Sequence, residues 1–163
     1  EYDECINFCK ELSSAFEVFL GATEPTSWPD GSACQYVALC NAEPGSESEI
    51  WSVKVAERGF VPHFTEDGTM VFAIRMLLDR SSDSWPKHPF WFLLKTRISK
   101  THFTITYGNK NFEFKKIGNF DFSNLFNYIV LQLTRTLNDT PLESFRETNT
   151  NSNIGFIDLK ESK

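Results

Sequence analysis

The sequence predicts a mostly β protein, an antiparallel β-sandwich of the jelly-roll type with a short N-terminal helix. Aromatic and β-branched residues alternate with polar ones between Phe90 and Phe114, as strands with one covered face require. The turn formers Gly108-Asn109-Lys110-Asn111 interrupt this alternation, where a hairpin would reverse the chain. The 163 residues are 40% hydrophobic, which is enough for one sizeable core.

The N-terminal part is expected to combine one helix with short strands. Residues 3–12 suit a helix because apolar side chains recur on one face, with Asp3 as the N-cap. Alternating apolar residues predict strands over 15–20 and 34–40, separated by a loop over 21–31.

The remaining residues are expected to complete the sheet. Residues 70–78 are apolar on both faces, which indicates a central strand. The other expected strands are 51–55, 61–64, 90–97, 102–107, 112–116, 128–134 and 154–159, with loops over 41–49, 80–89 and 136–153 and one helical turn over 120–127. We expect a disulfide-stapled helix-and-strand cap over 1–50 and a β-sandwich domain over 51–163, with one continuous domain as the alternative.

The cysteines bear on the cellular compartment. All four, Cys5, Cys9, Cys34 and Cys40, lie within the first 40 residues. An even set confined to one region predicts two disulfides and a secreted or extracellular protein, and three pairings are open. The alternatives are four reduced thiols or a zinc site, and the CxxxC and Cx5C spacings are unlike the usual zinc knuckles.

Charge is distributed unevenly along the chain, whose net charge is −6. Residues 1–68 carry a balance of −10 and residues 69–163 a balance of +4. Seven cations within 87–116 face only Glu113, and they are Lys87, Lys95, Arg97, Lys100, Lys110, Lys115 and Lys116. Such a region can recruit an anionic partner such as a sulfated glycan or an acidic protein surface, and the alternative is that lysines keep edge strands from aggregating.

No motif indicates catalysis. Ser81, Ser82 and Ser84 lack the Gly-x-Ser-x-Gly elbow, and neither a His-Glu-x-x-His motif nor a phosphate-binding glycine loop occurs. We therefore expect a protein that is not an enzyme, with no cofactor and no metal. No apolar run is long enough to span a bilayer, and we expect no nucleic-acid partner. The sequence does not predict an oligomeric state.

Exposed aromatic and polar residues suggest a sugar site. Trp85, with His88 and Trp91 nearby, could stack against a sugar ring while polar neighbours fix its hydroxyls, although such tryptophans more often pack in a core. Asn138-Asp139-Thr140 matches the N-glycosylation pattern, with Pro141 directly after it.

Residues 51–134 resemble a galectin domain. His63-Phe64-Thr65 is similar to the His-Phe-Asn element of that family, Trp85 follows at about the family's spacing, and Pro89-Phe90 is similar to the Pro-Phe that precedes the next strand. The resemblance implies a jelly-roll that binds a β-galactoside on one concave sheet. The family's arginine after the histidine and its Gly and Glu after the tryptophan have no counterparts here, so we expect a diverged site.

The first 57 residues resemble an apple/PAN module, because a CxxxC helix is followed by short strands and a closing Trp-Ser-Val-Lys-Val strand. The cysteine that usually follows the helix in that family is missing from this chain.

Together these observations predict a secreted protein that works by binding a glycan or an extracellular protein. The first hypothesis is glycan recognition by His63, Arg75, Trp85, Lys87 and His88. The second is a protein-interaction module, for example a receptor ectodomain or a secreted ligand, that uses the basic region 87–116.

Overall fold

The computed structural model describes residues 2–28, 30–45, 51–56, 59–78 and 88–139. In chain order the elements are α1 (Tyr2–Leu20), β1 (Thr26–Ser27), β2 (Ala33–Cys34), β3 (Val37–Pro44), β4 (Trp51–Val55), β5 (His63–Phe64), β6 (Met70–Leu78), β7 (His88–Ile98), β8 (His102–Tyr107), β9 (Lys110–Lys115) and α2 (Ser123–Asp139). A seven-stranded antiparallel sheet has the order β4-β3-β6-β7-β8-β9, with β5 also paired to β6, and β1 and β2 form a separate ribbon. The predicted antiparallel, mostly β class with an N-terminal helix is confirmed.

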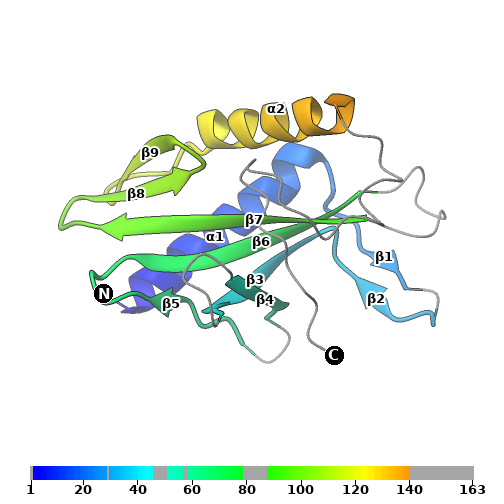
Figure 1. The fold of residues 1–163 in the computed structure, drawn as a ribbon, viewed down its shortest axis with the longest axis horizontal. Coiled ribbons are helices and arrows are strands. Elements are labelled where there is room, and N and C mark those ends of the chain that lie inside the picture. The colour runs from blue at the N-terminus through cyan, green and yellow to red at the C-terminus, as the bar shows by residue number, and fades with distance from the viewer. Residues whose placement is uncertain (1, 29, 46–50, 57–58, 79–87, 140–163) are drawn as a thin grey trace.

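Both helices pack on one side of the sheet, which we call the first face (Figure 1). Alternate residues of the strands point toward the helices, because successive side chains of a strand lie on opposite faces. The core on this face includes Phe72 from β6, Phe92 from β7 and Ile105 from β8. The covering layer here is therefore helical, and the jelly-roll pairing of two sheets stays a prediction.

Helix α1 is longer than the helix predicted over 3–12, and the strand predicted over 15–20 is wrong. Phe16 lies one helical turn beyond Leu12, and both side chains are fully buried, so continuing the helix extends one apolar stripe across the sheet. The helix ends at Leu20, and Gly21 follows with a φ of 66°, which turns the chain so that the Ala22 N–H donates to the carbonyl of Glu17 at 3.0 Å.

Helix α2 replaces both the strand predicted over 128–134 and the single helical turn predicted over 120–127. The β-branched and aromatic residues of this segment favour a strand locally. Leu125, Ile129 and Leu133 recur every four residues, however, and all three are buried against the first face. Tertiary packing of this stripe determines the helix.

The predicted strands of the central sheet are largely confirmed. β4, β6 and β8 have the predicted bounds, and β7 and β9 lie within two residues of theirs. The predicted loop over 41–49 is wrong at its start, because β3 continues to Pro44. The predicted strand 154–159 lies outside the described residues, as do most of the loops predicted over 80–89 and 136–153.

β3 links the two halves of the predicted domain division. It pairs with β4 through Cys40 and Val55, and with β6 through Val37 and Met76. Residues from both sides of the predicted boundary at residue 50 thus share one sheet.

The prediction of two disulfides is wrong, because the structure contains no disulfide among the four cysteines. The sheet explains part of this result. Cys9 on α1 belongs to the core of the first face and its Sγ lies 3.9 Å from Sδ of Met70. Cys40 on β3 belongs to a separate apolar cluster with Val71 and Ala73, whose side chains alternate with those of the first face. The sheet therefore lies between these two sulfurs.

Candidate functional site

The face of the sheet opposite the helices, which we call the second face, changes character from strand to strand. At the β3, β4 and β6 end it carries an apolar cluster formed by Cys40, Ala42, Trp51, Val53, Val71, Ala73 and Leu93. Toward β7, β8 and β9 it carries polar side chains instead, because Lys95 and Arg97 alternate with buried Leu94 and Thr96 of the first face.

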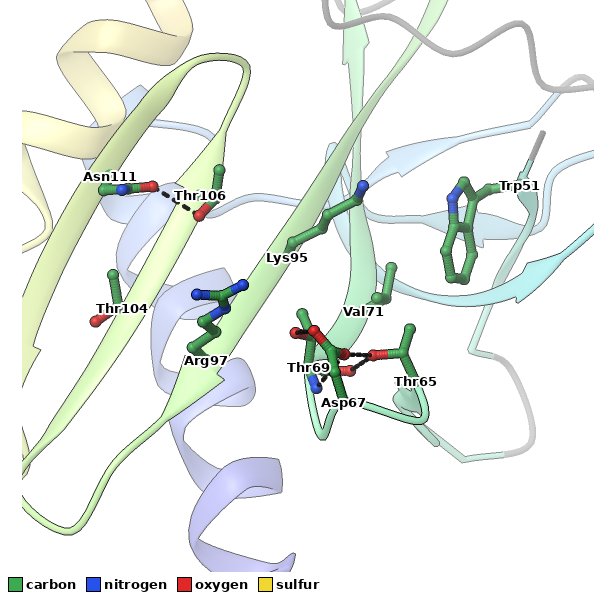
Figure 2. A pocket seen from close by; sticks show the side chains of 10 residues that line it. All are labelled: Trp51, Thr65, Asp67, Thr69, Val71, Lys95, Arg97, Thr104, Thr106 and Asn111. Carbon is green, nitrogen blue, oxygen red and sulfur yellow. Dashed lines mark hydrogen bonds between the residues drawn. The ribbon is translucent and has the colours of Figure 1, made fainter. Parts of the chain in front are cut away.

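A pocket of about 490 Å³ lies where these two regions meet (Figure 2). Its volume is within the usual range for sites that bind small molecules. It is lined by Trp51, Thr65, Asp67, Thr69, Val71, Lys95, Arg97, Thr104, Thr106 and Asn111. Strands β4, β6, β7, β8 and β9 contribute, together with the turn between β5 and β6, so the pocket forms only when the sheet has its native register.

Lys95 and Arg97 supply the positive charge of the pocket. They stand two residues apart on β7, about 7 Å along the strand, and both are exposed. Within the described part of the chain, neither side chain forms a hydrogen bond or an ion pair. Figure 2 shows both side chains extending from β7 among the other lining residues. Two cations are therefore available to a ligand.

Polar side chains from the next two strands flank these cations. Thr106 is the cross-strand partner of Lys95, and Thr104 is the partner of Arg97. The Thr106 hydroxyl donates to Oδ1 of Asn111 at 2.7 Å (Figure 2). This hydrogen bond orients the Asn111 amide and leaves its NH₂ group available as a donor.

Asp67 lies on the β6 side of the pocket, in the turn between β5 and β6. Two threonines of the same turn donate hydrogen bonds to its carboxylate. Its Oδ1 accepts from the Thr65 hydroxyl and from the Thr69 backbone N–H at 3.2 Å, and its Oδ2 accepts from the Thr69 hydroxyl at 3.1 Å. Gly68, with a φ of 79°, supplies the left-handed conformation that the turn requires. The hydrogen bond from Thr65, then those from Thr69, and finally the charge of Arg97 lower the pKa of Asp67, so its carboxylate is ionised at neutral pH.

Trp51 forms an apolar end of the pocket. The indole is only 8% exposed, and it packs in the apolar cluster of the second face. The His63 ring lies 5.5 Å from it in an edge-on arrangement. Trp51 therefore offers a ligand an edge rather than a full stacking face.

Three of the five residues predicted for a sugar site are described, and none of the three lines the pocket. His63 contacts Trp51 beside the pocket without lining it, and Arg75 is buried where its Nη2 donates to the Gln35 carbonyl at 3.0 Å and its guanidinium lies 6.0 Å from the Trp28 ring. His88 begins β7 and pairs with Leu78. Trp85 and Lys87 lie outside the described residues.

The predicted basic region separates into several environments. Lys95 and Arg97 line the pocket, and exposed Lys100 and Lys115 stand near the β7–β8 turn. Lys87 lies outside the described residues, and the other two lysines of the region support packing. The Lys110 Nζ lies 4.8 Å from the Tyr128 ring centroid, and Lys116 forms an ion pair with Glu4.

Other sequence features receive a place in the structure. Asn138, in the predicted glycosylation pattern, is exposed in the last turn of α2. Within the described residues, no three His, Cys, Asp or Glu side chains are grouped to hold a metal, and no helix is long and apolar enough to cross a membrane.

Several lining residues were missed by sequence reasoning, namely Trp51, Thr65, Asp67, Thr69, Val71, Thr104, Thr106 and Asn111. One signal was available for the last three: the alternation in β8 and β9 places them on the face of Lys95 and Arg97. The contribution of Trp51 depends on β3 lying between β4 and β6, which the sequence does not reveal.

Comparisons with protein-family models, with curated proteins and with solved structures gave no match. The resemblances to galectins and to apple/PAN modules therefore stay predictions.

Proposed function

We propose that this protein acts by binding rather than by catalysis, and that the pocket of the second face recognises a glycan. The observation that carries this proposal is the convergence of hydroxyl, amide, carboxylate and cationic side chains from five strands and one turn on a single pocket. A polyhydroxylated ligand needs many donors and acceptors at fixed positions, and the sheet supplies them on rigid elements.

The apolar end of the pocket fits the same ligand. A sugar ring carries C–H groups as well as hydroxyls, and the edges of Trp51 and Val71 lie beside the polar lining residues. The ligand would therefore place its C–H groups toward β4 and β6 and its hydroxyls toward β8 and β9.

Secretion stays a prediction. It depended on disulfides that the structure does not contain, so the proposal of glycan binding makes no use of the compartment.

A glycan array tests the proposed function. The parent protein is compared with Asn111→Ala and Thr104→Val, which remove pocket groups, and with Lys100→Gln, which changes an exposed lysine that does not line the pocket. We expect hits that persist in Lys100→Gln and weaken in both pocket variants. Trp85→Ala tests the sugar site predicted from the sequence. Hits lost only in that variant would show that the glycan binds at Trp85 and not in the pocket. An array without hits would refute glycan binding.

A second candidate function is recognition of an acidic protein segment at the end of the sheet. The Lys116 N–H donates to the Thr101 carbonyl at 2.9 Å, which brings Lys115 and Ile117 next to the turn that holds Lys100. Ile117 is 91% exposed. An exposed isoleucine near exposed lysines suits a partner that is acidic and partly apolar.

Fluorescence anisotropy with a labelled glutamate-rich peptide that contains leucine tests this candidate. We expect affinity that falls with added salt and is lost in the double variant Lys100→Gln/Lys115→Gln, while Arg97→Gln retains it. Equal loss in the Arg97 variant would assign the peptide to the pocket instead.

A further inference from the structure

We infer that the glycan bound in the pocket is an acidic one, with one carboxylate or sulfate group held by Lys95 and Arg97 and with a hydroxyl donated to Asp67. This inference rests on the proposed glycan binding and specifies the chemical class of the ligand. It follows from three features of the lining residues: their charge, the state of Asp67 and the orientation of the flanking donors.

The first feature is the availability of the two cations. Lys95 and Arg97 project from the same face of β7, and within the described residues neither is neutralised by an ion pair. A guanidinium presents two parallel N–H groups to a planar oxyanion, and an ammonium adds a point charge beside it. Together they can hold one oxyanion of a ligand.

The second feature is that Asp67 forms no ion pair with Arg97. Three hydrogen bonds from Thr65 and Thr69 hold its carboxylate within its own turn. Among the described residues, Oδ2 accepts one hydrogen bond, from the Thr69 hydroxyl, so this oxygen has a further lone pair for a ligand hydroxyl. Asp67 therefore acts as a fixed acceptor beside Arg97, on the β6 side of the pocket.

The third feature is the orientation of the flanking donors. The hydrogen bond from Thr106 occupies Oδ1 of Asn111, which leaves the Asn111 NH₂ group as a donor for a ligand. Thr104, next to Arg97 across the strands, adds a hydroxyl. Neutral donors beside two cations complete the coordination of an oxyanion better than that of a neutral ring oxygen.

The charge balance limits the ligand to few negative groups. Lys95 and Arg97 against ionised Asp67 leave the lining residues one positive charge in excess. A second anionic group placed near Asp67 would be repelled by its carboxylate. A glycan with a single acidic group is therefore favoured over a densely sulfated chain.

An array of matched glycans tests this inference. Each glycan is present in a neutral form, in a form with one uronic or sialic acid and in a form with one sulfate. Heparin tetrasaccharide is added as the polyanion. We expect the singly acidic forms to bind about tenfold more tightly than their neutral counterparts, the contribution of one charge-assisted contact. The carboxylate and sulfate arms identify the oxyanion.

Variants test whether the pocket residues cause the preference for acidic glycans. Arg97→Gln should reduce the ratio of acidic to neutral binding toward one, while Lys100→Gln leaves it unchanged. Asp67→Asn should raise the affinity for heparin tetrasaccharide relative to the singly acidic forms, because it removes the opposing charge.

The outcomes separate this inference from the proposed function. Neutral and acidic forms that bind equally, and that both weaken in Asn111→Ala, would overturn the acidic preference and leave glycan binding intact. Heparin tetrasaccharide as the tightest ligand in the parent protein would overturn the limit on charge. An array without hits would overturn both proposals.

Discussion

Lys116 and Glu4 form an ion pair of 3.0 Å between Nζ and Oε2 that joins the residue after β9 to the first turn of α1. The Lys116 side chain is only 10% exposed and its ammonium lies 4.9 Å from the Phe103 ring centroid, whereas the Glu4 side chain is 44% exposed. The two partners therefore have unequal surroundings.

This inequality predicts unequal effects of substitution. Glu4→Gln should cost at most about 1 kcal/mol of unfolding free energy, because the pair is partly solvated. Lys116→Ala should cost more, since it also removes the buried stem and the contact with the ring. Urea denaturation of both variants measures the difference. A larger loss in Glu4→Gln would show that the ion pair dominates.

Thr96→Val should stabilise the protein. The Thr96 hydroxyl is fully buried on the first face and has no hydrogen-bond partner within the structure described. Valine has nearly the same shape and removes the desolvated hydroxyl, so a gain of about 1 kcal/mol is expected. Thermal unfolding against Thr104→Val, at a residue that is partly exposed, provides the matched control. A lower melting temperature in Thr96→Val would contradict this account.

Stability should fall in alkaline solution. Burial raises the pKa of the Cys40 thiol from 9.0 to about 12, against the smaller opposing effect of Arg75, and burial also raises the pKa of Cys9. Above pH 9 the unfolded chain releases these protons while the folded protein retains them. The unfolding free energy should thus decrease between about pH 9 and 12, by up to about 1.4 kcal/mol per pH unit for each thiol.

The variant Cys40→Ala isolates this effect. It lowers stability at all pH values by creating a cavity, but its decline above pH 9 should be shallower than that of the parent protein. Parallel curves for the two proteins would assign the alkaline decline to other groups.

Phe8→Ala should lower the unfolding free energy by about 3 to 5 kcal/mol. The Phe8 ring stacks on Phe103 with centroids 4.0 Å apart and also contacts Phe120 and Phe122, so α1 is an integral part of the core. Chemical denaturation measures the loss. Phe19→Ala, at a residue that is 40% exposed, should cost clearly less. Similar values for the two variants would separate α1 from the core.

Asp67 should titrate below its ordinary pKa of 3.8, and Thr65→Val should raise its pKa more than Arg97→Gln does. The hydrogen bond from Thr65 is the largest cause of the shift, and the Arg97 charge is the smallest. The hydrogen bonds of the turn stabilise the folded protein above the unfolded pKa, and this stabilisation is lost as the pH falls through the lowered folded value. Carboxyl carbon shifts in NMR report the titration, and a larger effect of Arg97→Gln would reverse the order of causes.

The strands of the central sheet were predictable because apolar residues recur at every second position within each strand, a pattern that short stretches of sequence contain. The prediction failed around Phe16 and Ile129, because aromatic and β-branched residues recur in both segments as they do in a strand. Both side chains are buried on helices because helical spacing aligns them with other apolar residues over the first face. Only the packed structure selects between the two periods.

The candidate site was predictable in part for a related reason. Lys95 and Arg97 were identified from local charge, and their common face follows from their spacing. Trp51 and Asp67 reach the same pocket through strand order and through a turn, which are long-range and conformational properties. The disulfide prediction failed because an even cysteine count contains no information on which face of the sheet each sulfur occupies.

The alternation within β7 has a consequence for insertions and deletions. Phe92, Leu94 and Thr96 face the helices, while Lys95 and Arg97 face the pocket, so core and site share one strand residue by residue. Loss or gain of a single residue in the middle of β7 would rotate the remainder of the strand by half a turn and place both cations beneath the helices. Gene variants that shift β7 in this way should therefore lose folding and binding together, whereas point changes at residues 95 and 97 should separate the two.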